Sequence, residues 1–188
     1  MRWIISRQPK CAGGRSSRSR LSFRYYCCVL TLFQSLFSHQ AWADAAMLSA
    51  IQSHPESLHD EWLLKTLHHM VFVQRAFLSR FLGKPFDRTK ESQPRTSFDE
   101  LIQHFQATHE EELAFVNGLS EGELTRRFEL SFLQTEPTLA EGLTQVVMHS
   151  QNHRGQCLTR IRENGGKPPT LDYIVWAKDR PSPIWPKS

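Results

Sequence analysis

Two histidines four residues apart, His149 and His153, have the residue type and spacing that best suit metal chemistry in this sequence. On an α-helix, residues four apart lie one turn apart on the same face, so both imidazoles can reach one ion. Gln145 and Gln156 share that face, whereas the opposite face is apolar. A polar face beside a core needs bonding partners, and a metal ion would supply them.

A metal site needs a third ligand from another helix, and the segment TLHHMVFV offers His68 and His69. Their side chains point about 100° apart, so at most one of them can face the same ion. Spacing alone prefers His69 only slightly. The competing interpretation makes these histidines hydrogen-bonded core residues, and spacing alone leaves that choice open.

Four further histidines are expected to be solvated or to make only local contacts, as is His68. They are His54, His59, His104 and His109. Each pair is five residues apart, which places its two members on different faces of a helix.

Other catalytic motifs are absent from the sequence. It contains no Gly-rich phosphate loop, no Gly-x-Ser-x-Gly elbow and no Cys-x-x-Cys pair. Cys11, Cys27, Cys28 and Cys157 lack the spacing of a disulfide framework, which favours a reducing compartment. Cys157 is predicted to be a small core residue rather than a nucleophile.

The net charge of +4 comes from the N-terminus. Residues 1–29 hold seven of the 23 basic residues and no acidic one, and the other 159 residues hold 16 basic and 19 acidic residues. The part expected to fold is therefore mildly acidic, which gives no case for binding nucleic acid. A length of 188 residues suits one domain with a real core.

Residues 1–28 are rich in Arg and Ser and are predicted to be a disordered basic leader or a mis-assigned start. An alternative makes residues 1–43 a signal peptide of an exported protein, because a basic region and an apolar run precede Ala41-Trp42-Ala43.

We favour a first helix that begins near Val29, since apolar residues recur there at helical spacing. Polar residues within 34–40 interrupt the apolar run, which a signal peptide tolerates poorly. No stretch reaches the roughly 18 apolar residues of a membrane span, so no membrane association is expected.

Three capping-box patterns predict the starts of the later helices: Ser53–Glu56, Ser97–Glu100 and Thr138–Glu141. Glycines at 83, 118 and 165 mark their ends. Residues 126–134 alternate enough for a short extended segment, and residues 171–179 suit a last short helix. The pattern predicts an all-α four-helix bundle, up-down with one long connection between the second and third helices.

Four segments resemble the signature segments of the DinB/YfiT-like proteins, a damage-inducible family of metalloproteins. They are LTLFQSLFSHQAWADAAMLSAI, LLKTLHHMVFVQRAFL, TLAEGLTQVVMHSQNHRGQ and ENGGKPPTLDYIVWAKD. The resemblance covers about residues 29–180, which leaves 181–188 as a C-terminal tail, and the HRGQ segment and PPTLDYIVW are its most specific parts.

The resemblance implies a four-helix bundle, often dimeric, in which three histidines hold one divalent metal ion. One ligand comes from the second helix and a His-x-x-x-His pair comes from the fourth. Carried onto this chain, the ligands are His69, His149 and His153. Many relatives have a further His where Gln145 stands, so the fine tuning of the metal stays open.

Three neutral imidazoles leave coordination positions open, as catalytic sites do, and suit Zn, Ni, Fe or Co. The resemblance, together with the open triad, implies a metal-dependent enzyme acting on a small-molecule substrate. It would be either a thiol S-transferase that uses a low-molecular-weight thiol, as some relatives are, or a hydrolase. The alternative is a non-catalytic metal-binding stress-response bundle. Candidates for hydrogen bonds to the metal ligands, or for contacts with substrate, are Asp44, Gln145 and Gln156. No catalytic residue is assigned. A cytoplasmic homodimer is expected.

Overall fold

The computed structural model describes residues 19–93 and 97–187, with side chains from residue 29 onward. Its elements, in chain order, are α1 (Ser19–Gln52), α2 (Pro55–Leu58), α3 (Glu61–Phe81), α4 (Arg88–Glu91), α5 (Phe98–Gly118), the 3₁₀-helices η1 (Glu121–Thr125) and η2 (Ser131–Leu133), α6 (Leu139–Glu163) and α7 (Tyr173–Asp179). The described residues contain no strand, which confirms the predicted all-α class.

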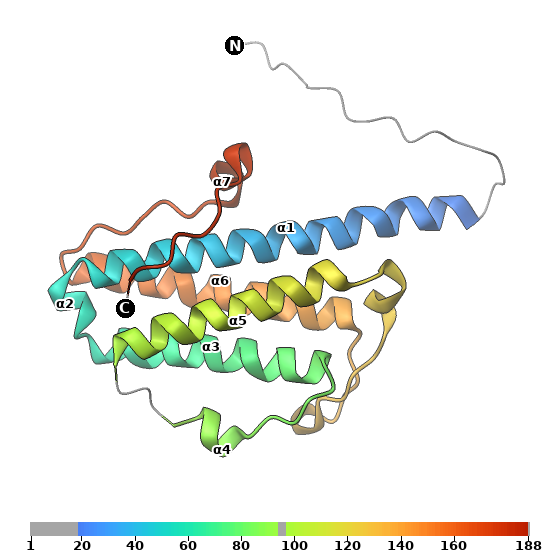
Figure 1. The fold of residues 1–188 in the computed structure, drawn as a ribbon, viewed down its shortest axis with the longest axis horizontal. Helices are drawn as coiled ribbons and strands as arrows, with labels where there is room; N and C mark the ends of the chain where they lie inside the picture. The colour runs from blue at the N-terminus through green and yellow to red at the C-terminus, as the bar shows by residue number, and fades with distance from the viewer. Residues whose placement is uncertain (1–18, 94–96, 188) are drawn as a thin grey trace, which may run out of the picture.

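The four long helices form a ring (Figure 1). Helix α1 packs against α5 and α6, and α3 packs against the same two helices. The seam between α3 and α6 therefore lies opposite the seam between α1 and α5. In Figure 1, α3 and α5 run in one direction and α1 and α6 in the other, because the connection that contains α4 returns along the bundle. This is the long connection that the sequence predicts.

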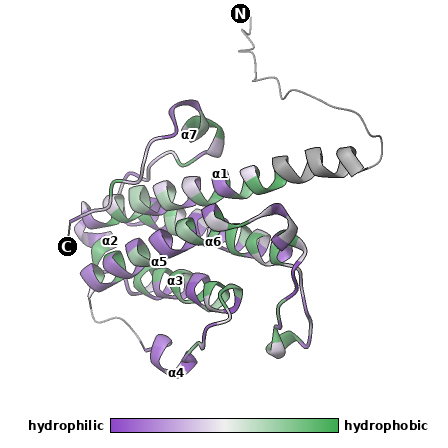
Figure 2. Ribbon diagram, turned by 45° about the vertical axis from the view of Figure 1, so that its right-hand side comes forward, coloured by the Kyte–Doolittle hydropathy of each residue, from purple (hydrophilic) through white to green (hydrophobic). Residues whose placement is uncertain are grey.

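Buried apolar residues form two core clusters, and each cluster has members from all four long helices. The first cluster includes Met47, Leu67, Phe105 and Ile161. The second includes Phe37, Phe81, Val116 and Leu143. Figure 2 shows apolar and polar residues alternating along the long helices, as amphipathic helices require.

Buried polar side chains lie between the two clusters along each long helix, and we call them the polar layer. Its members are Gln40 and Asp44 on α1, Gln74 on α3, Thr108, His109 and Glu112 on α5, and Ser150 and Arg154 on α6. Each of these side chains is at most 2% exposed. A core interrupted in this way is stable only if the polar groups bond to one another.

Helix α6, which carries two of the predicted ligands, is bounded as predicted. Thr138 accepts a hydrogen bond from the Glu141 backbone N–H at 3.3 Å, and the Glu141 carboxylate accepts one from the Thr138 N–H at 2.7 Å. Asn164 ends the helix, and Gly165 follows with φ of +88°, a left-handed conformation that favours glycine. Ser97 likewise caps α5 as predicted.

The predicted start of the second long helix at Ser53 is wrong. The Ser53 hydroxyl donates back to the Ala50 carbonyl of α1 at 3.0 Å, so it does not cap a new helix. Helix α1 continues to Gln52, the short α2 follows, and α3 begins at Glu61. Its cap is Asp60, whose carboxylate accepts a hydrogen bond from the Leu63 N–H at 2.8 Å.

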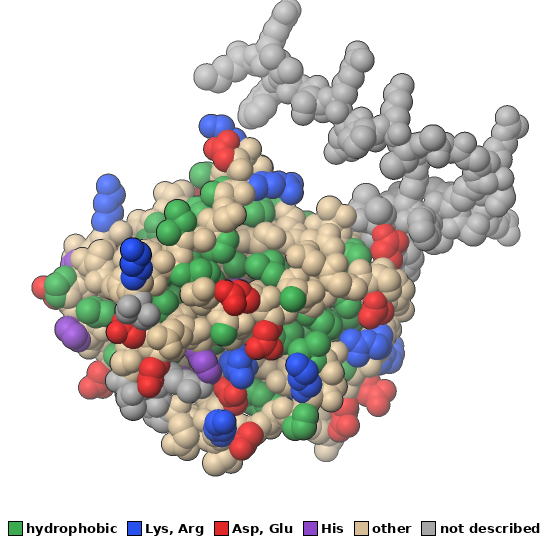
Figure 3. Space-filling model, in the orientation of Figure 1, with side chains coloured by type: hydrophobic (Ala, Val, Ile, Leu, Met, Phe, Trp, Pro, Cys, Tyr) green, Lys and Arg blue, Asp and Glu red, His purple; other side chains and the backbone are tan. Residues whose placement is uncertain are grey.

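The N-terminal part of α1 also differs from expectation, because the helix begins at Ser19 rather than near Val29. The predicted leader lies outside the described residues over 1–18, and its interpretation stays a prediction. Within the described part of the chain, no helix is both long enough and apolar enough to cross a membrane. On the face that Figure 3 shows, basic and acidic side chains lie interspersed rather than separated by sign.

The predicted extended segment at 126–134 does not form a strand. Isolated bridges join Arg127 to Thr138 and Leu130 to Thr135, and η2 interrupts the segment between them. The segment still packs on the bundle, since Phe128 and Leu130 belong to the second core cluster.

Gly142 of α6 lies where no side chain fits. A Cβ placed there would lie 2.6 Å from a ring carbon of Phe81 and 2.7 Å from the ring of Phe128. We predict that Gly142→Ala lowers the free energy of unfolding by about 1–3 kcal/mol, because packed aromatic rings must shift. Gly155→Ala on the same helix is the control: its Cβ meets nothing within 4 Å, so it should raise the free energy by up to about 1 kcal/mol. Urea unfolding measures both, and a stabilising Gly142→Ala would contradict the prediction.

Candidate metal centre

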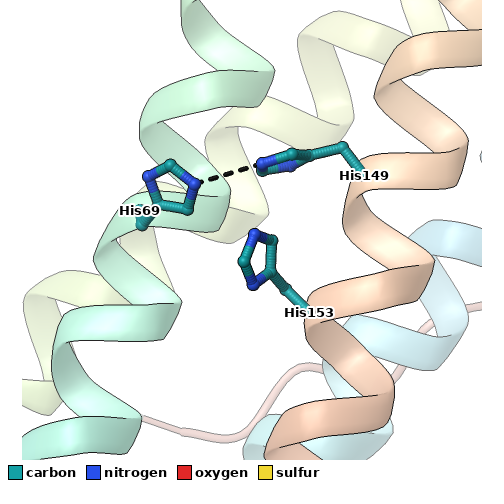
Figure 4. A group of neighbouring side chains, drawn as sticks. All are labelled: His69, His149 and His153. Atoms are coloured by element: carbon teal, nitrogen blue, oxygen red, sulfur yellow. Dashed lines mark hydrogen bonds between the residues drawn. The ribbon is translucent and has the colours of Figure 1, made fainter.

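The three predicted ligands come together on the seam between α3 and α6 (Figure 4). His69 projects from α3, and His149 and His153 project from successive turns of α6. One nitrogen from each ring can be chosen so that all three lie within 4.8 Å of one another. Of the two candidates on α3, only His69 belongs to this group.

The distances within the triad suit an ion. The Nε2 atoms of His69 and His149 are 3.1 Å apart, and two nitrogens bound to one tetrahedral ion at about 2.0–2.1 Å would be separated by about 3.3 Å. A neutral pair can also make this contact if one ring donates its N–H to the other. Small movements of these rings would therefore convert a histidine pair into a ligand pair.

Two rings of the triad, those of His69 and His149, are held in the form that a metal ligand needs. Burial lowers the pKa of His149 to about 4, and repulsion from His153 and His69 adds to this effect. Burial likewise lowers the pKa of His69, helped by His153 and His68. Neutral imidazoles have a free lone pair, so His69 and His149 are ready to bind a cation near pH 7.

Two further contacts bear on the ring orientations. His153 Nδ1 lies 2.8 Å from Gln156 Oε1, so this nitrogen is the N–H donor and Nε2 is left for an ion. His149 Nδ1 is buried and has no hydrogen-bond partner among the described residues. The donor set and the distances thus fit a divalent metal, and an N–H left without a protein partner is open to water or to a further group.

The other sequence candidates have mixed outcomes. Gln156 contacts the triad as predicted. Gln145 is exposed on α6. Asp44 is fully buried and bonds Arg154, His109 and Gln74 rather than a ring of the triad. Cys157 is buried in the first core cluster, and burial raises the pKa of its thiol to about 12, so a role in packing fits it better than one as a nucleophile.

The polar layer lies at the level of the triad and ties the helices together. Arg154 Nε donates to Asp44 Oδ1 at 2.8 Å, which joins α6 to α1. His109 Nε2 lies 2.9 Å from Asp44 Oδ2, which joins α5 to α1. Gln74 Nε2 donates to Ser150 Oγ at 3.1 Å, which joins α3 to α6. The two helices that carry the histidines are therefore linked by a second contact inside the bundle.

Charges in the polar layer compensate one another. Burial alone would raise the pKa of Asp44, but Arg154 and His109 bring it down to about 2. Burial alone would lower the pKa of His109, but Asp44 and Glu112 raise it to about 9. His109 Nδ1 lies 3.2 Å from Glu112 Oε2, at ion-pair distance but without hydrogen-bond geometry. His109 is therefore a buried cation at neutral pH.

The expectation that His109 is solvated or makes only local contacts is wrong. Its side chain is 1% exposed and pairs with Asp44, 65 residues earlier in the chain. The available signal was the His109–Glu112 spacing of three residues beside the buried Phe105, which puts both groups on an inner face. The sequence likewise did not predict the buried role of Arg154, because its partner Asp44 lies on α1, far away in the chain.

Comparisons with known proteins agree with this architecture. A sequence model of the DinB superfamily matches residues 60–157, which include all three histidines. A solved structure described as a DinB-like protein from Bacillus cereus is similar with a TM-score of 0.52 and 18% identity, and the match covers 80% of this chain and 93% of that one. No curated protein matches the sequence.

The family match spans more than half of the chain, so this protein belongs to the DinB superfamily. The solved relative supports the fold. The three-histidine group is compatible with metal binding.

Removing one charge of the polar layer should cost much of the stability. We predict that Arg154→Met lowers the free energy of unfolding by about 3–5 kcal/mol, because it leaves the buried Asp44 carboxylate without its main partner. Arg162→Met is the matched control, since Arg162 is exposed on the same helix and should change stability little. Chemical denaturation of both variants measures the difference. Equal losses of unfolding free energy in the two variants would contradict the prediction that the buried ion pair stabilises the fold more than an exposed arginine does.

The raised pKa of His109 predicts a loss of stability in alkali. The folded state holds this proton up to about pH 9, whereas the unfolded chain releases it near 6.5. The contribution is fully present below pH 6.5 and is lost as the pH rises through 9. We expect the thermal midpoint to fall over that range, and His109→Gln to flatten the slope. An unchanged slope in this variant would rule out His109 as the titrating group.

Proposed function

We propose that this protein binds one divalent metal ion through His69, His149 and His153 and acts as a metal-dependent enzyme. The observation that carries the proposal is the convergence of three imidazoles from two helices, with ligand atoms within 4.8 Å of one another. Membership of the DinB superfamily supports it.

Three protein ligands leave at least one coordination position for water or substrate. Imidazole nitrogens suit Zn, Ni, Fe or Co, and such an ion, when bound, supplies Lewis-acid chemistry and lowers the pKa of a bound water or thiol. The chain's own contribution is to keep His149 neutral and to orient His153 through Gln156. For the reaction we propose transfer to or from a low-molecular-weight thiol, with metal-assisted hydrolysis as the neighbouring option.

A non-catalytic role is the second candidate. The triad joins α3 to α6 on the outer side of a seam whose inner side is already joined by Gln74 and Ser150. An ion there would strengthen the bundle without any reaction. Turnover of a thiol or ester substrate by the metal-loaded protein would favour the enzyme, whereas a large thermal shift without turnover would favour the structural role.

We further propose a cytoplasmic homodimer that binds neither nucleic acid nor membranes. The acidic balance of residues 30–188 supports the absence of nucleic-acid binding. Mass spectrometry of the mature N-terminus tests the location, because cleavage after residue 43 would identify an exported protein. Light scattering tests the dimer.

Metal content tests the ligand set. We expect near-stoichiometric metal in the purified protein and its loss in each of His69→Ala, His149→Ala and His153→Ala, because two imidazoles bind a divalent ion much more weakly than three. His68→Ala is the control, since His68 neighbours His69 but lies outside the group. Elemental analysis after gel filtration gives the ratio. Metal that survives all three ligand substitutions would refute the site.

A further inference from the structure

A second pocket lies on the seam between α1 and α5, opposite the seam that carries the triad. It has a volume of about 390 Å³, is open to solvent, and is lined in part by α7 and the segment that follows it. Helix α7 contacts α1, and in Figure 1 the segment that follows α7 runs back across α1. None of the triad or polar-layer residues lines it.

The α1 wall of this pocket is polar. Gln34, Ser35 and Ser38 line it at helical spacing, and they belong to the polar residues that interrupt the apolar run of α1. Ser35 shares a 2.8 Å hydrogen bond with the Tyr173 hydroxyl of α7, and Gln34 donates to the Val116 carbonyl of α5 at 3.4 Å. The Ser38 hydroxyl in turn donates to the Gln34 carbonyl at 2.8 Å. These bonds hold the wall in place, and the second N–H of the Gln34 amide is left for a ligand.

Among the described residues that line the pocket, Arg180 alone is charged, and it is exposed to solvent. Its guanidinium carbon lies 5.8 Å from the centre of the Trp176 ring. Within the described residues, no carboxylate lies within 4.0 Å of it, and the neighbouring Asp179 is in contact with Lys178 instead. A guanidinium over an aromatic ring keeps its hydrogen-bond donors free for a carboxylate or phosphate.

The backbone conformation of Arg180 is also unusual for a residue other than glycine. Arg180 ends α7 with φ of +46°, a left-handed conformation that usually favours glycine. Strain of this kind tends to persist where the side chain has a role. Here the side chain reaches Trp176, which is buried and donates from Nε1 to the Pro181 carbonyl at 3.1 Å.

We propose that this pocket binds a small organic anion. Its carboxylate or phosphate pairs with Arg180, its apolar part packs on Trp176 and Leu113, and the Gln34 amide of α1 donates a further hydrogen bond to it. The volume suits a small molecule, since ligand pockets usually measure about 300–1,000 Å³. The absence of any acidic residue from the lining favours an anion over a cation. The site is independent of the proposed metal chemistry.

Nuclear magnetic resonance titration of the full chain tests this site, with the Trp176 Nε1–H signal as the reporter. Benzoate and phenyl phosphate are the probes, and benzamide is the neutral analogue of benzoate. We expect saturable shifts with one or both anions and a response to benzamide at least about tenfold weaker, because the neutral amide lacks the charge-assisted bond. The stronger of the two anions identifies the acidic group that the pocket prefers.

Two variants remove the guanidinium. Arg180→Gln keeps a long polar side chain, and Arg180→Gly also relieves the positive φ, so it should fold at least as well as the natural chain. Both should weaken benzoate binding at least about tenfold. Lys178→Gln removes a charge from the same helix outside the pocket and should change it little.

Three outcomes would overturn the proposal. They are the absence of a saturable shift with either anion, binding of benzamide as tight as that of the stronger anion, and a Lys178→Gln effect as large as that of Arg180→Gln. Metal content should be unchanged in both Arg180 variants, so a failure here and a failure of the proposed metal site would be distinguished.

Discussion

The ion pair between Asp44 and Arg154 is the interaction on which the rest of the structure depends. Both side chains are at most 2% exposed, and each buried charge would cost several kcal/mol without its partner. The 2.8 Å contact fixes the rotation of α6 relative to α1. Because Gln74 bonds both Asp44 and Ser150, α3 is brought into the same register. His69 then faces His149 and His153 as a consequence of bonds made inside the bundle.

Apolar packing alone does not require such a layer. Replacing buried ion pairs by apolar side chains often leaves stability equal or higher, so stability by itself does not explain the polar layer. Two apolar clusters, one on each side, place no directional constraint on the helices and could pack in more than one register. We interpret the layer as the feature that selects one register. Arg154 and the protonated His109 face Asp44 and Glu112, and burial raises the pKa of Glu112.

The two opposite seams of the bundle differ in chemistry. The α3/α6 seam presents imidazoles whose lowered pKa values suit a cation. The α1/α5 seam presents hydroxyl and amide groups with a single guanidinium, which suits an anion. The same four helices thus carry the proposed metal site and the proposed anion pocket on opposite seams, separated by the core.

The sequence by itself determined the four long helices, the bounds of α6 and the spacing of His149 and His153, because caps and periodicity act within a few residues. It did not predict the short helices α2 and α4 or the two 3₁₀-helices. It failed at Ser53, where the hydroxyl bonded back to α1 instead of capping a new helix. Only the tertiary structure decided between His68 and His69 on physical grounds, since that choice depends on the rotation of α3. It also revealed His109 and Arg154 as buried charges, because their common partner Asp44 lies on a helix far away in the chain.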